Sequence, residues 1–272
     1  MLQAPGEIRT PNDERPGSEP EPKTARRLDS ISGFDSSLAK RHSPFNPWLI
    51  WQLADSAFPT GGFAHSSGLE AAWQHAEVRG RTELTKFAEA SLNQLGHASL
   101  PFVMAAFDTP EKLPEFDGLC DAFTSNHVAN RASRAQGRAF LAAVERIFSA
   151  RGVHAASASN RKNGLNRFDC RAPFGHFAPV FGACLRQLGL SREVTGRMFF
   201  FNHLRGVLAA AVRLNIVGPT EAQILQIHLA ANAEVVLKGC ESLSLDDVAQ
   251  TSPLLDLWQA AQDRLYSRLF QS

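Results

Sequence analysis

The 272-residue sequence has few cysteines that could form disulfides or bind a structural metal ion. Its four cysteines are widely spaced, at Cys120, Cys170, Cys184 and Cys240. They form no C-x-x-C pair and no His/Cys cluster with zinc spacing. No run of 18 apolar residues predicts a membrane-spanning helix, and the N-terminus lacks the apolar region of a secretory signal. We therefore expect a cytoplasmic protein with reduced thiols, long enough to bury a core without disulfides or metal.

Signals for β-strands are also absent, because no alternating runs of Val, Ile and Thr are bounded by turns. From Pro47 onward Ala, Leu, Arg, Glu and Gln dominate, and start and stop residues for helices recur. This pattern predicts an all-α fold, with a single globular helical domain of about nine or ten helices over residues 47–272. Residues 1–46 mix Pro, Gly and both charges with few large apolar side chains, which predicts a disordered N-terminal tail.

Capping residues and prolines predict several helix boundaries. Thr82 opens a helix that Pro101 bends or splits, because proline lacks a backbone N–H and its ring clashes with the preceding turn. Ser191 is the expected N-cap of a long helix. Thr220 and Gln223 have the spacing of a capping box for the helix after it.

The last predicted helix begins at Ser252 and Pro253. Its apolar residues recur at helical spacing and form a stripe almost to the end of the chain: Leu254, Trp258, Ala261, Leu265 and Leu269. Chain ends usually fray unless something holds them. The stripe therefore packs into the core or occupies a groove on another protein.

The charge of the chain is near zero overall but unevenly distributed. Residues 126–214 contain fourteen basic and three acidic residues, and a long polar, basic loop is expected at 152–173. The basic helices either face acidic helices within the fold or form a face for an anionic ligand or an acidic partner. Few aromatics lie among the basic residues and no nucleic-acid-binding motif occurs, so we expect no nucleic-acid partner.

Residues 53–72, LADSAFPTGGFAHSSGLEAA, interrupt the helical spacing. A phosphate-binding loop would need a lysine after the glycines, and a serine hydrolase would need G-x-S-x-G after a strand. A bend between two helices explains the residue types. Pro59 would end the first helix, the glycines would supply positive φ, and His65 or Ser66 would cap the next helix. A bend does not require an aromatic residue such as Phe63 at its tip, and exposed apolar surface there indicates a contact surface.

Two carboxylates, Asp55 and Glu70, flank this bend and could form an acid/base pair. More simply, Glu70 is favoured near a helix N-terminus, and Asp55 bonds to nearby backbone or basic groups. No two of the nine histidines have the i, i+4 spacing of a helical metal pair, although ligands could still converge in the fold. One enzymatic alternative stays open, a metal-dependent hydrolase that uses His65, Ser66 and Asp55.

Four segments together resemble the UreF family, the urease accessory proteins that help insert nickel into urease. They are residues 53–72, 130–141 (NRASRAQGRAFL), 175–182 (GHFAPVFG) with 204–223, and 252–272. The resemblance spans roughly residues 48–272 and implies an all-α homodimer without catalytic activity of its own. It implies binding to UreD (also called UreH) and recruitment of the GTPase UreG, so that the assembly delivers nickel to apo-urease. Nickel would be handled by that assembly, and no cofactor, metal or membrane partner is expected for this chain.

The resemblance also implies two partner-binding regions. The family's C-terminal segment falls on Arg264, Leu265, Tyr266, Arg268, Leu269 and Phe270. Its region near the dimer centre and the GTPase-facing surface falls on Gly61, Gly62, Phe63, His65 and Glu70. We therefore expect an adaptor whose terminal apolar residues are covered by a neighbouring subunit. The alternative within the family is a regulator of GTP hydrolysis by UreG.

Overall fold

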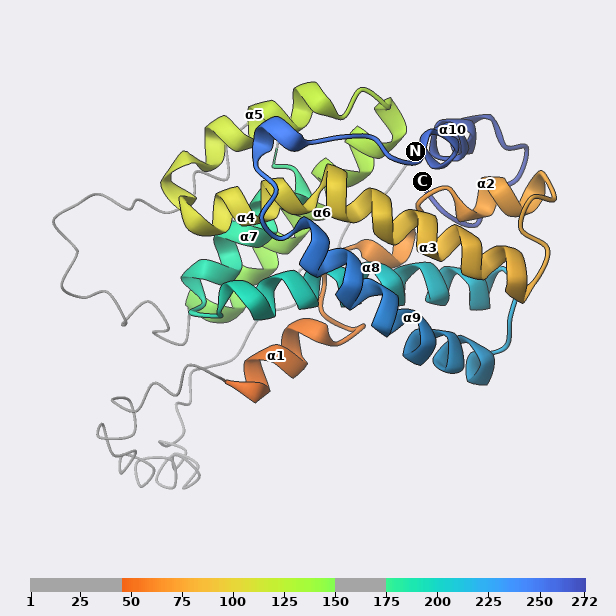
Figure 1. The fold of residues 1–272 in the computed structure, drawn as a ribbon, viewed down its shortest axis with the longest axis horizontal. Helices are drawn as coiled ribbons and strands as arrows, with labels where there is room; N and C mark the ends of the chain where they lie inside the picture. Colours follow the sequence, from red (N-terminus) through yellow and green to blue (C-terminus); the bar gives the residue numbers. More distant parts are fainter. Residues whose placement is uncertain (1–45, 150–174) are drawn as a thin grey trace, which may run out of the picture. The chain divides into compact units, whose positions relative to one another are not determined.

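A computed structural model describes residues 46–149 and 175–272. Within these two ranges the chain forms ten α-helices joined by turns and short 3₁₀ segments, without a β-strand (Figure 1). The all-α prediction is therefore confirmed. The predicted tail lies outside the described residues except for Asn46, and so does the whole predicted loop 152–173. In the described part of the chain, no helix is long and apolar enough to cross a membrane.

The helices follow one another as α1 (Pro47–Ala54), α2 (Leu69–Gln74), α3 (Arg81–Ala98), α4 (Leu100–Asp108), α5 (Leu113–Phe123), α6 (His127–Ser149), α7 (Phe177–Gln187), α8 (Arg192–Arg213), α9 (Pro219–Cys240) and α10 (Pro253–Ala261). Helix α7 packs against both α4 and α6, while α8 pairs with α9 and α3. The short helix α2 and the last helix α10 pack against each other at one end of the bundle.

The centre of the bundle is close-packed and apolar. Phe140 of α6 and Phe181 of α7 have ring centroids 5.3 Å apart, and Phe181 lies 5.5 Å from Phe199 of α8. Helix α7 approaches α4 so closely that a Cβ added to Gly182 would overlap the Val103 carbonyl oxygen. A side chain at this position would force the two helices apart, because protein interiors have little free volume.

The start of α7 is fixed by a buried polar cluster. The Asp117 carboxylate accepts hydrogen bonds from the backbone N–H groups of Gly175 and His176, at 2.7 and 2.6 Å. The His176 side chain is fully buried, and its two ring nitrogens lie 3.1 Å from Ser133 Oγ and 3.0 Å from Asp121 Oδ1. This cluster joins α5, α6 and the N-terminus of α7, and it leaves no ring nitrogen of the histidine unsatisfied.

The predicted helix boundaries at Pro101, Ser191 and Pro253 are confirmed, and the one at Thr220 is wrong. Pro101 does split the helix, because α3 ends at Ala98 and α4 begins at Leu100. Ser191 caps α8 by accepting the Val194 N–H at 3.2 Å. The capping box expected at Thr220 does not form, since α9 begins at Pro219, which takes the first helical position where its missing N–H costs nothing.

The continuous stripe predicted for the end of the chain is also wrong. Helix α10 stops at Ala261, and a single 3₁₀ turn follows over Gln262–Arg264. Leu265 and Leu269 therefore do not share a helical face with Leu254. The chain instead turns back over residues 265–272, which we call the terminal segment, toward the bend at residues 55–68.

Candidate docking site at the bend and the terminal segment

The bend begins earlier and ends later than the sequence predicts. Helix α1 ends at Ala54, five residues before Pro59, and the exposed Asp55 carboxylate accepts the Ala57 N–H at 2.8 Å. Gly61 has a φ of 72°, as expected of a glycine that reverses the chain. The N-cap of α2 is Gly68, with a φ of 87°, instead of His65 or Ser66. A Cβ on Gly68 would lie 2.9 Å from the backbone nitrogen of Gln259, so α10 packs directly on this glycine.

Glu70 connects the bend to the terminal segment through a buried carboxylate. The residue is 2% exposed, and its oxygens accept hydrogen bonds from the backbone N–H groups of Leu269 at 2.6 Å and Phe270 at 3.1 Å. The Nε2 amide of Gln262, which is itself fully buried, donates a third hydrogen bond at 2.5 Å. A buried charge is stable only when it is hydrogen-bonded in this way. Glu70 therefore fixes the path of the terminal segment.

Further hydrogen bonds run between the backbone of the bend and the end of the chain. The Gln271 N–H donates to the Ala64 carbonyl at 2.8 Å, and the Ser66 N–H donates to the carbonyl oxygen of Ser272. The Nδ1 atom of His65 shares a hydrogen bond of 2.5 Å with the Ser272 hydroxyl. The two regions that the sequence analysis singled out separately thus form one continuous structure.

Arg213, near the end of α8, contacts both the bend and the terminal segment. Its guanidinium carbon lies 3.8 Å from the centroid of the Phe63 ring and 4.2 Å from that of the Phe270 ring. Its Nη1 atom also donates to the Phe63 carbonyl at 2.6 Å. A guanidinium stacked between two aromatic rings is a cation–π contact on both faces. No sequence pattern indicates this role, because Arg213 is one of many arginines in the basic segment 126–214.

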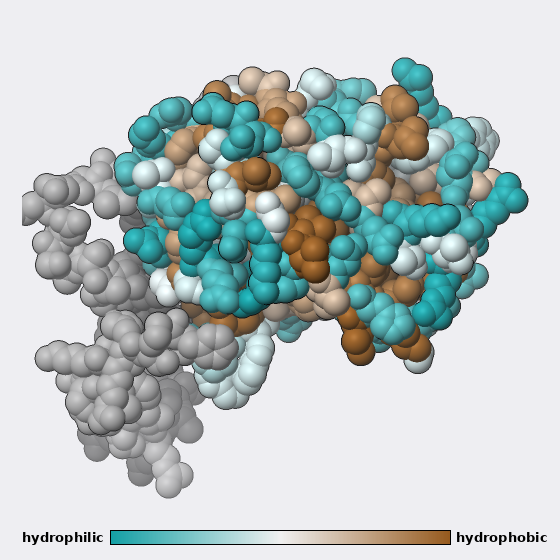
Figure 2. All heavy atoms as spheres, in the orientation of Figure 1, coloured by the Kyte–Doolittle hydropathy of each residue, from teal (hydrophilic) through white to brown (hydrophobic). Residues whose placement is uncertain are grey.

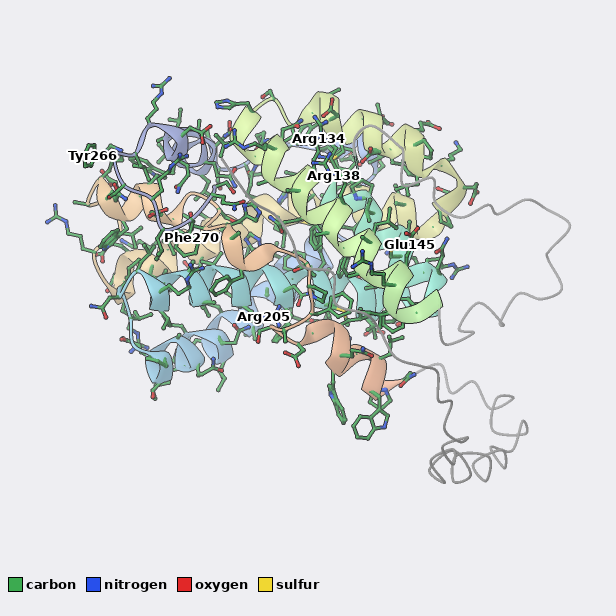
Figure 3. All side chains as sticks on the ribbon, turned by 180° about the vertical axis from the view of Figure 1, so that it is seen from behind. Arg134, Arg138, Glu145, Arg205, Tyr266 and Phe270 are labelled. Atoms are coloured by element: carbon green, nitrogen blue, oxygen red, sulfur yellow. The ribbon has the colours of Figure 1, made fainter. Side chains whose placement is uncertain are left out.

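The terminal segment has an inner and an outer side. Phe270 points inward and is 4% exposed, so the expectation that a neighbouring subunit covers it is wrong. Tyr266 is fully exposed and Leu269 is 51% exposed, and Figure 3 shows Tyr266 at the edge of the molecule. On α10, Leu254 and Leu257 are 66% and 63% exposed, and apolar atoms lie at the surface over this helix in Figure 2. We call Leu254, Leu257, Tyr266 and Leu269 the outer face.

Charged residues surround the start of the terminal segment. The Asp263 carboxylate accepts from Arg131 of α6 at 2.8 Å and from Arg268 at 3.1 Å, and the His127 ring lies 3.4 Å away. The hydrogen bond from Arg131 and the nearby positive charges hold the pKa of Asp263 below its usual value. The predicted residues Arg264 and Arg268 are both exposed, while Leu265 is half-buried.

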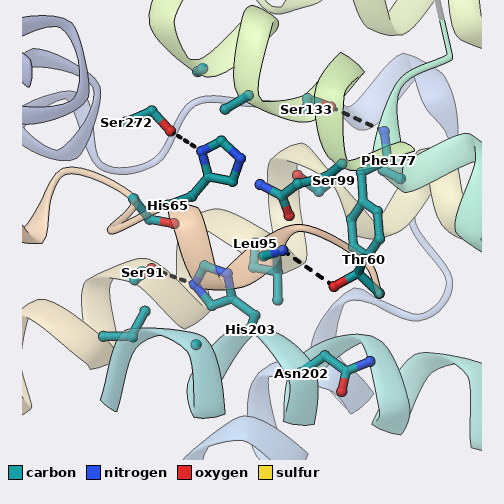
Figure 4. A pocket seen from close by; sticks show the side chains of 18 of the residues that line it. Thr60, His65, Ser91, Leu95, Ser99, Ser133, Phe177, Asn202, His203 and Ser272 are labelled. Atoms are coloured by element: carbon teal, nitrogen blue, oxygen red, sulfur yellow. Dashed lines mark hydrogen bonds between the residues drawn. The ribbon is translucent and has the colours of Figure 1, made fainter. Parts of the chain in front are cut away.

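A cavity of about 490 Å³ lies behind the bend, with His65 and His203 on its wall (Figure 4). His203 Nε2 shares a hydrogen bond of 2.5 Å with Ser91 Oγ, and burial lowers the pKa of His203 to about 4. Burial, and then the charge of Arg131, also lowers the pKa of His65. Both imidazoles are therefore neutral at pH 7. Burial raises the pKa of Cys120, another lining residue, to about 12, so this thiol stays protonated.

The structure does not assemble the residues of the hydrolase alternative. Asp55 is used in a local turn, His65 is bonded to Ser272, and the Ser66 hydroxyl accepts the Glu70 N–H at 3.4 Å. Glu70 and Asp55 likewise have separate roles and form no acid/base pair. Over residues 46–149 and 175–272, no group of three or more His, Cys, Asp and Glu side chains is placed to hold a metal ion.

Comparisons with known proteins identify the family of the chain. The UreF family model matches residues 78–230, more than half of the chain. The chain belongs to the UreF family. The "Urease accessory protein F" of rice (Oryza sativa subsp. indica) is 36% identical over 91% of this chain and 94% of its own length. That of Arabidopsis thaliana is 37% identical over 86% of this chain and 96% of its own length. A "UreF-like" protein of Schizosaccharomyces pombe is 32% identical over 81% of this chain and 94% of its own length.

Proposed function

We propose that this UreF-family chain acts without catalysis as an adaptor in urease maturation. In this proposal the outer face binds a UreD-like (UreH-like) accessory protein, and the bend with α8 faces a UreG-like GTPase. The assembled complex then delivers nickel to apo-urease. Membership of the UreF family supports the role in urease maturation. The two binding surfaces are inferred from the geometry of the bend and the terminal segment.

The exposed outer face is the observation that carries this proposal. Four large side chains within sixteen residues of one another remain in water, although α10 packs against α2 and the terminal segment is hydrogen-bonded to Glu70. Exposed tyrosine and leucine on an ordered backbone can be buried by a partner with little further loss of conformational entropy. A fraying chain end would lose more entropy on binding.

The bend offers a second surface that stays accessible beside the first. Phe63 is 73% exposed even though one face of its ring is covered by Arg213. Its position is fixed by the terminal segment through Arg213 and Phe270. Occupation of the outer face by one partner would therefore leave an ordered aromatic side chain for a second partner. We infer that this is the surface for the GTPase.

Binding to a purified UreD-like protein from the same organism tests the first surface. We expect the double variant Tyr266→Ala and Leu269→Ala to weaken binding at least tenfold, because exposed anchors contribute about 1 kcal/mol or more each. The matched control is Ile227→Ala on α9, which removes an exposed apolar side chain away from the outer face. Undiminished binding by the double variant, or by a chain truncated after Gln262, would defeat the assignment.

Regulation of GTP hydrolysis is the second candidate, and the geometry gives it less support. Arg213 is held between two rings, and Arg205 donates to the Ala54 carbonyl, so both of these arginines beside the bend already have partners. A transferred arginine must be free to enter the GTPase site. A single-turnover assay of UreG with and without this chain separates the two, and an unchanged rate supports the adaptor.

A further inference from the structure

One serine of the terminal segment stands in a sequence context that the proposed function does not explain. Ser267 follows Arg264 by three residues. Many serine/threonine kinases select arginine at this position, because an acidic pocket of the kinase binds the guanidinium group. Within residues 46–149 and 175–272 the same spacing occurs at four hydroxyl residues: Thr82, Ser149, Thr195 and Ser267. The structure decides which of the four a kinase can reach.

Three of these four hydroxyl residues lie in helices. Thr82 belongs to the first turn of α3, Ser149 ends α6, and Thr195 lies in α8, where its side chain is fully buried. A kinase binds its substrate as an extended chain, so a helical hydroxyl is reached only after the helix unwinds locally. Ser267 is exposed and lies outside the helices, after the 3₁₀ turn Gln262–Arg264. Of the four, it alone combines an exposed side chain with a non-helical backbone.

The backbone around Ser267 is attached only lightly to the rest of the described chain. Leu265 already has an extended backbone, with φ −67° and ψ 136°. In the described part of the chain, one residue of another helix hydrogen-bonds the backbone of residues 265–268: Gln74 of α2 donates Nε2 to the Ser267 carbonyl at 2.8 Å. The bonds to Glu70 begin only at Leu269. Residues 265–268 can therefore enter an active site by breaking one exposed backbone contact, while the Glu70 bonds remain.

Two exposed arginines, Arg264 and Arg268, accompany this serine. Arg264 makes no ion pair with a described residue, so a kinase can bind it without breaking one. Arg268 pairs with Asp263 at 3.1 Å, and exposed pairs of this kind contribute little to stability. A phosphate on Ser267 would therefore have a neighbouring arginine that can exchange a carboxylate for a phosphate.

A phosphate on Ser267 would also lie within the outer face. The fully exposed Tyr266 precedes Ser267, and Leu269, which is 51% exposed, follows it by two residues. Figure 3 shows Tyr266 at the edge of the molecule. A phosphoserine carries a charge of about −1.5 to −2 at pH 7. A partner that buries Tyr266 and Leu269 would have to remove water from this charge as well, which costs free energy.

We propose that Ser267 is a phosphorylation site for an arginine-directed serine kinase, and that its phosphate prevents the outer face from binding the UreD-like protein. This inference rests on the proposed function, because it regulates the surface assigned there. In the transfer, the Ser267 hydroxyl oxygen forms a bond to the γ-phosphorus of ATP, the bond from this phosphorus to the ADP oxygen breaks, and the hydroxyl proton passes to a base of the kinase. Hydrolysis of the phosphate ester by a phosphatase restores the serine and the docking surface.

Phosphorylation of the full chain tests the first part. The chain is incubated with ATP and the catalytic domain of a calmodulin-dependent protein kinase, whose substrates carry arginine three residues before the serine. Mass spectrometry then measures the phosphate at each residue. We expect Ser267 to be modified at least tenfold faster than Thr82 and Thr195. Arg264→Ala should slow modification of Ser267 at least tenfold, whereas the matched control Arg268→Ala should change it less than threefold. An unmodified Ser267, or equal rates for the two arginine variants, overturns the inference.

Binding to the purified UreD-like protein tests the second part. The phosphorylated chain should bind at least tenfold more weakly than a Ser267→Ala variant treated with the same kinase, which carries any phosphate placed elsewhere. Phosphatase treatment should restore the affinity of the untreated chain.

The results separate this inference from the proposed function. Equal dissociation constants for the phosphorylated chain and the Ser267→Ala variant overturn the inference, and so does a loss of affinity that the phosphatase does not reverse. The proposed function stands in both cases, provided that the Tyr266→Ala and Leu269→Ala variant still loses binding. Failure of the untreated chain to bind overturns both.

Discussion

The contact between α4 and α7 and the junction between the bend and the terminal segment are held together by opposite means. The helix contact is apolar and close, with Gly182 against the Val103 carbonyl and no side-chain hydrogen bond needed at that point. The junction depends on a buried carboxylate, Glu70, and on a cation, Arg213, between two rings. Apolar packing stabilises in proportion to buried area, whereas directed polar contacts fix one particular geometry.

This difference explains how one chain combines a stable bundle with a precisely placed surface. Disturbing the helix contact changes the volume of the core and should destabilise the whole fold. Disturbing the junction should release residues 265–272 locally and leave the bundle folded. Four substitutions or conditions test this distinction, from the largest expected effect to the smallest.

Gly182→Ala should have the largest effect on global stability. The new methyl group would overlap the Val103 carbonyl oxygen, and separating α4 from α7 should cost about 3 kcal/mol of unfolding free energy. Gly118→Ala on α5 is the control, because no atom lies within 4 Å of its added Cβ. The control should gain about 0.5–1 kcal/mol from better helix propensity. Urea denaturation measures both, and equal stabilities would contradict the close contact.

Acidification should lower the free energy of unfolding through His203, which lines the cavity together with residues of the core and of the bend. The pKa of His203 is about 4 in the folded chain and about 6.5 when unfolded, so the unfolded state binds more protons between these pH values. Stability should therefore fall as the pH decreases from about 6.5 to 4, by about 2.5 kcal/mol from this residue. His203→Gln should flatten the dependence over this window. Denaturation curves at each pH provide the check, and an unchanged slope would contradict the burial of His203.

Glu70→Gln should loosen the junction without unfolding the bundle. The amide NH₂ would face backbone N–H donors, and leaving a buried donor unsatisfied costs about 2 kcal/mol. Hydrogen exchange at the amides of Leu269 and Phe270 should accelerate, while exchange in α4 and α7 stays unchanged. Glu83→Gln, an exposed change of the same kind on α3, serves as the control. Faster exchange throughout the chain would show that the junction is not a local unit.

Arg213→Met should have the smallest effect of the four. Methionine keeps the apolar stem and removes the charge, so the loss is about 1 kcal/mol from the cation–π contacts and the bond to the Phe63 carbonyl. Binding of a UreG-like protein should weaken more than binding of a UreD-like protein, because Phe63 loses its support. Arg192→Met, which breaks an ion pair on the same helix, is the control. Equal losses for both partners would argue against two separate surfaces.

The sequence by itself determined the helical class, the division of the helices at Pro101, the cap at Ser191 and the family. These features depend on local properties, since helical periodicity, capping and proline geometry act within one or two turns. The family resemblance likewise rests on contiguous motifs. The sequence also indicated that the bend and the chain end were distinctive, through Phe63 and the late apolar residues.

Only the tertiary structure decided that these two regions meet. Glu70 and Phe270 are 200 residues apart in the chain, and no local pattern reveals that the carboxylate accepts N–H groups from the terminal segment. The predicted stripe was wrong because those tertiary hydrogen bonds outweigh the helical propensity after Ala261. For the same reason Phe270 is buried and Tyr266 exposed, although both are aromatic residues near the end of the chain.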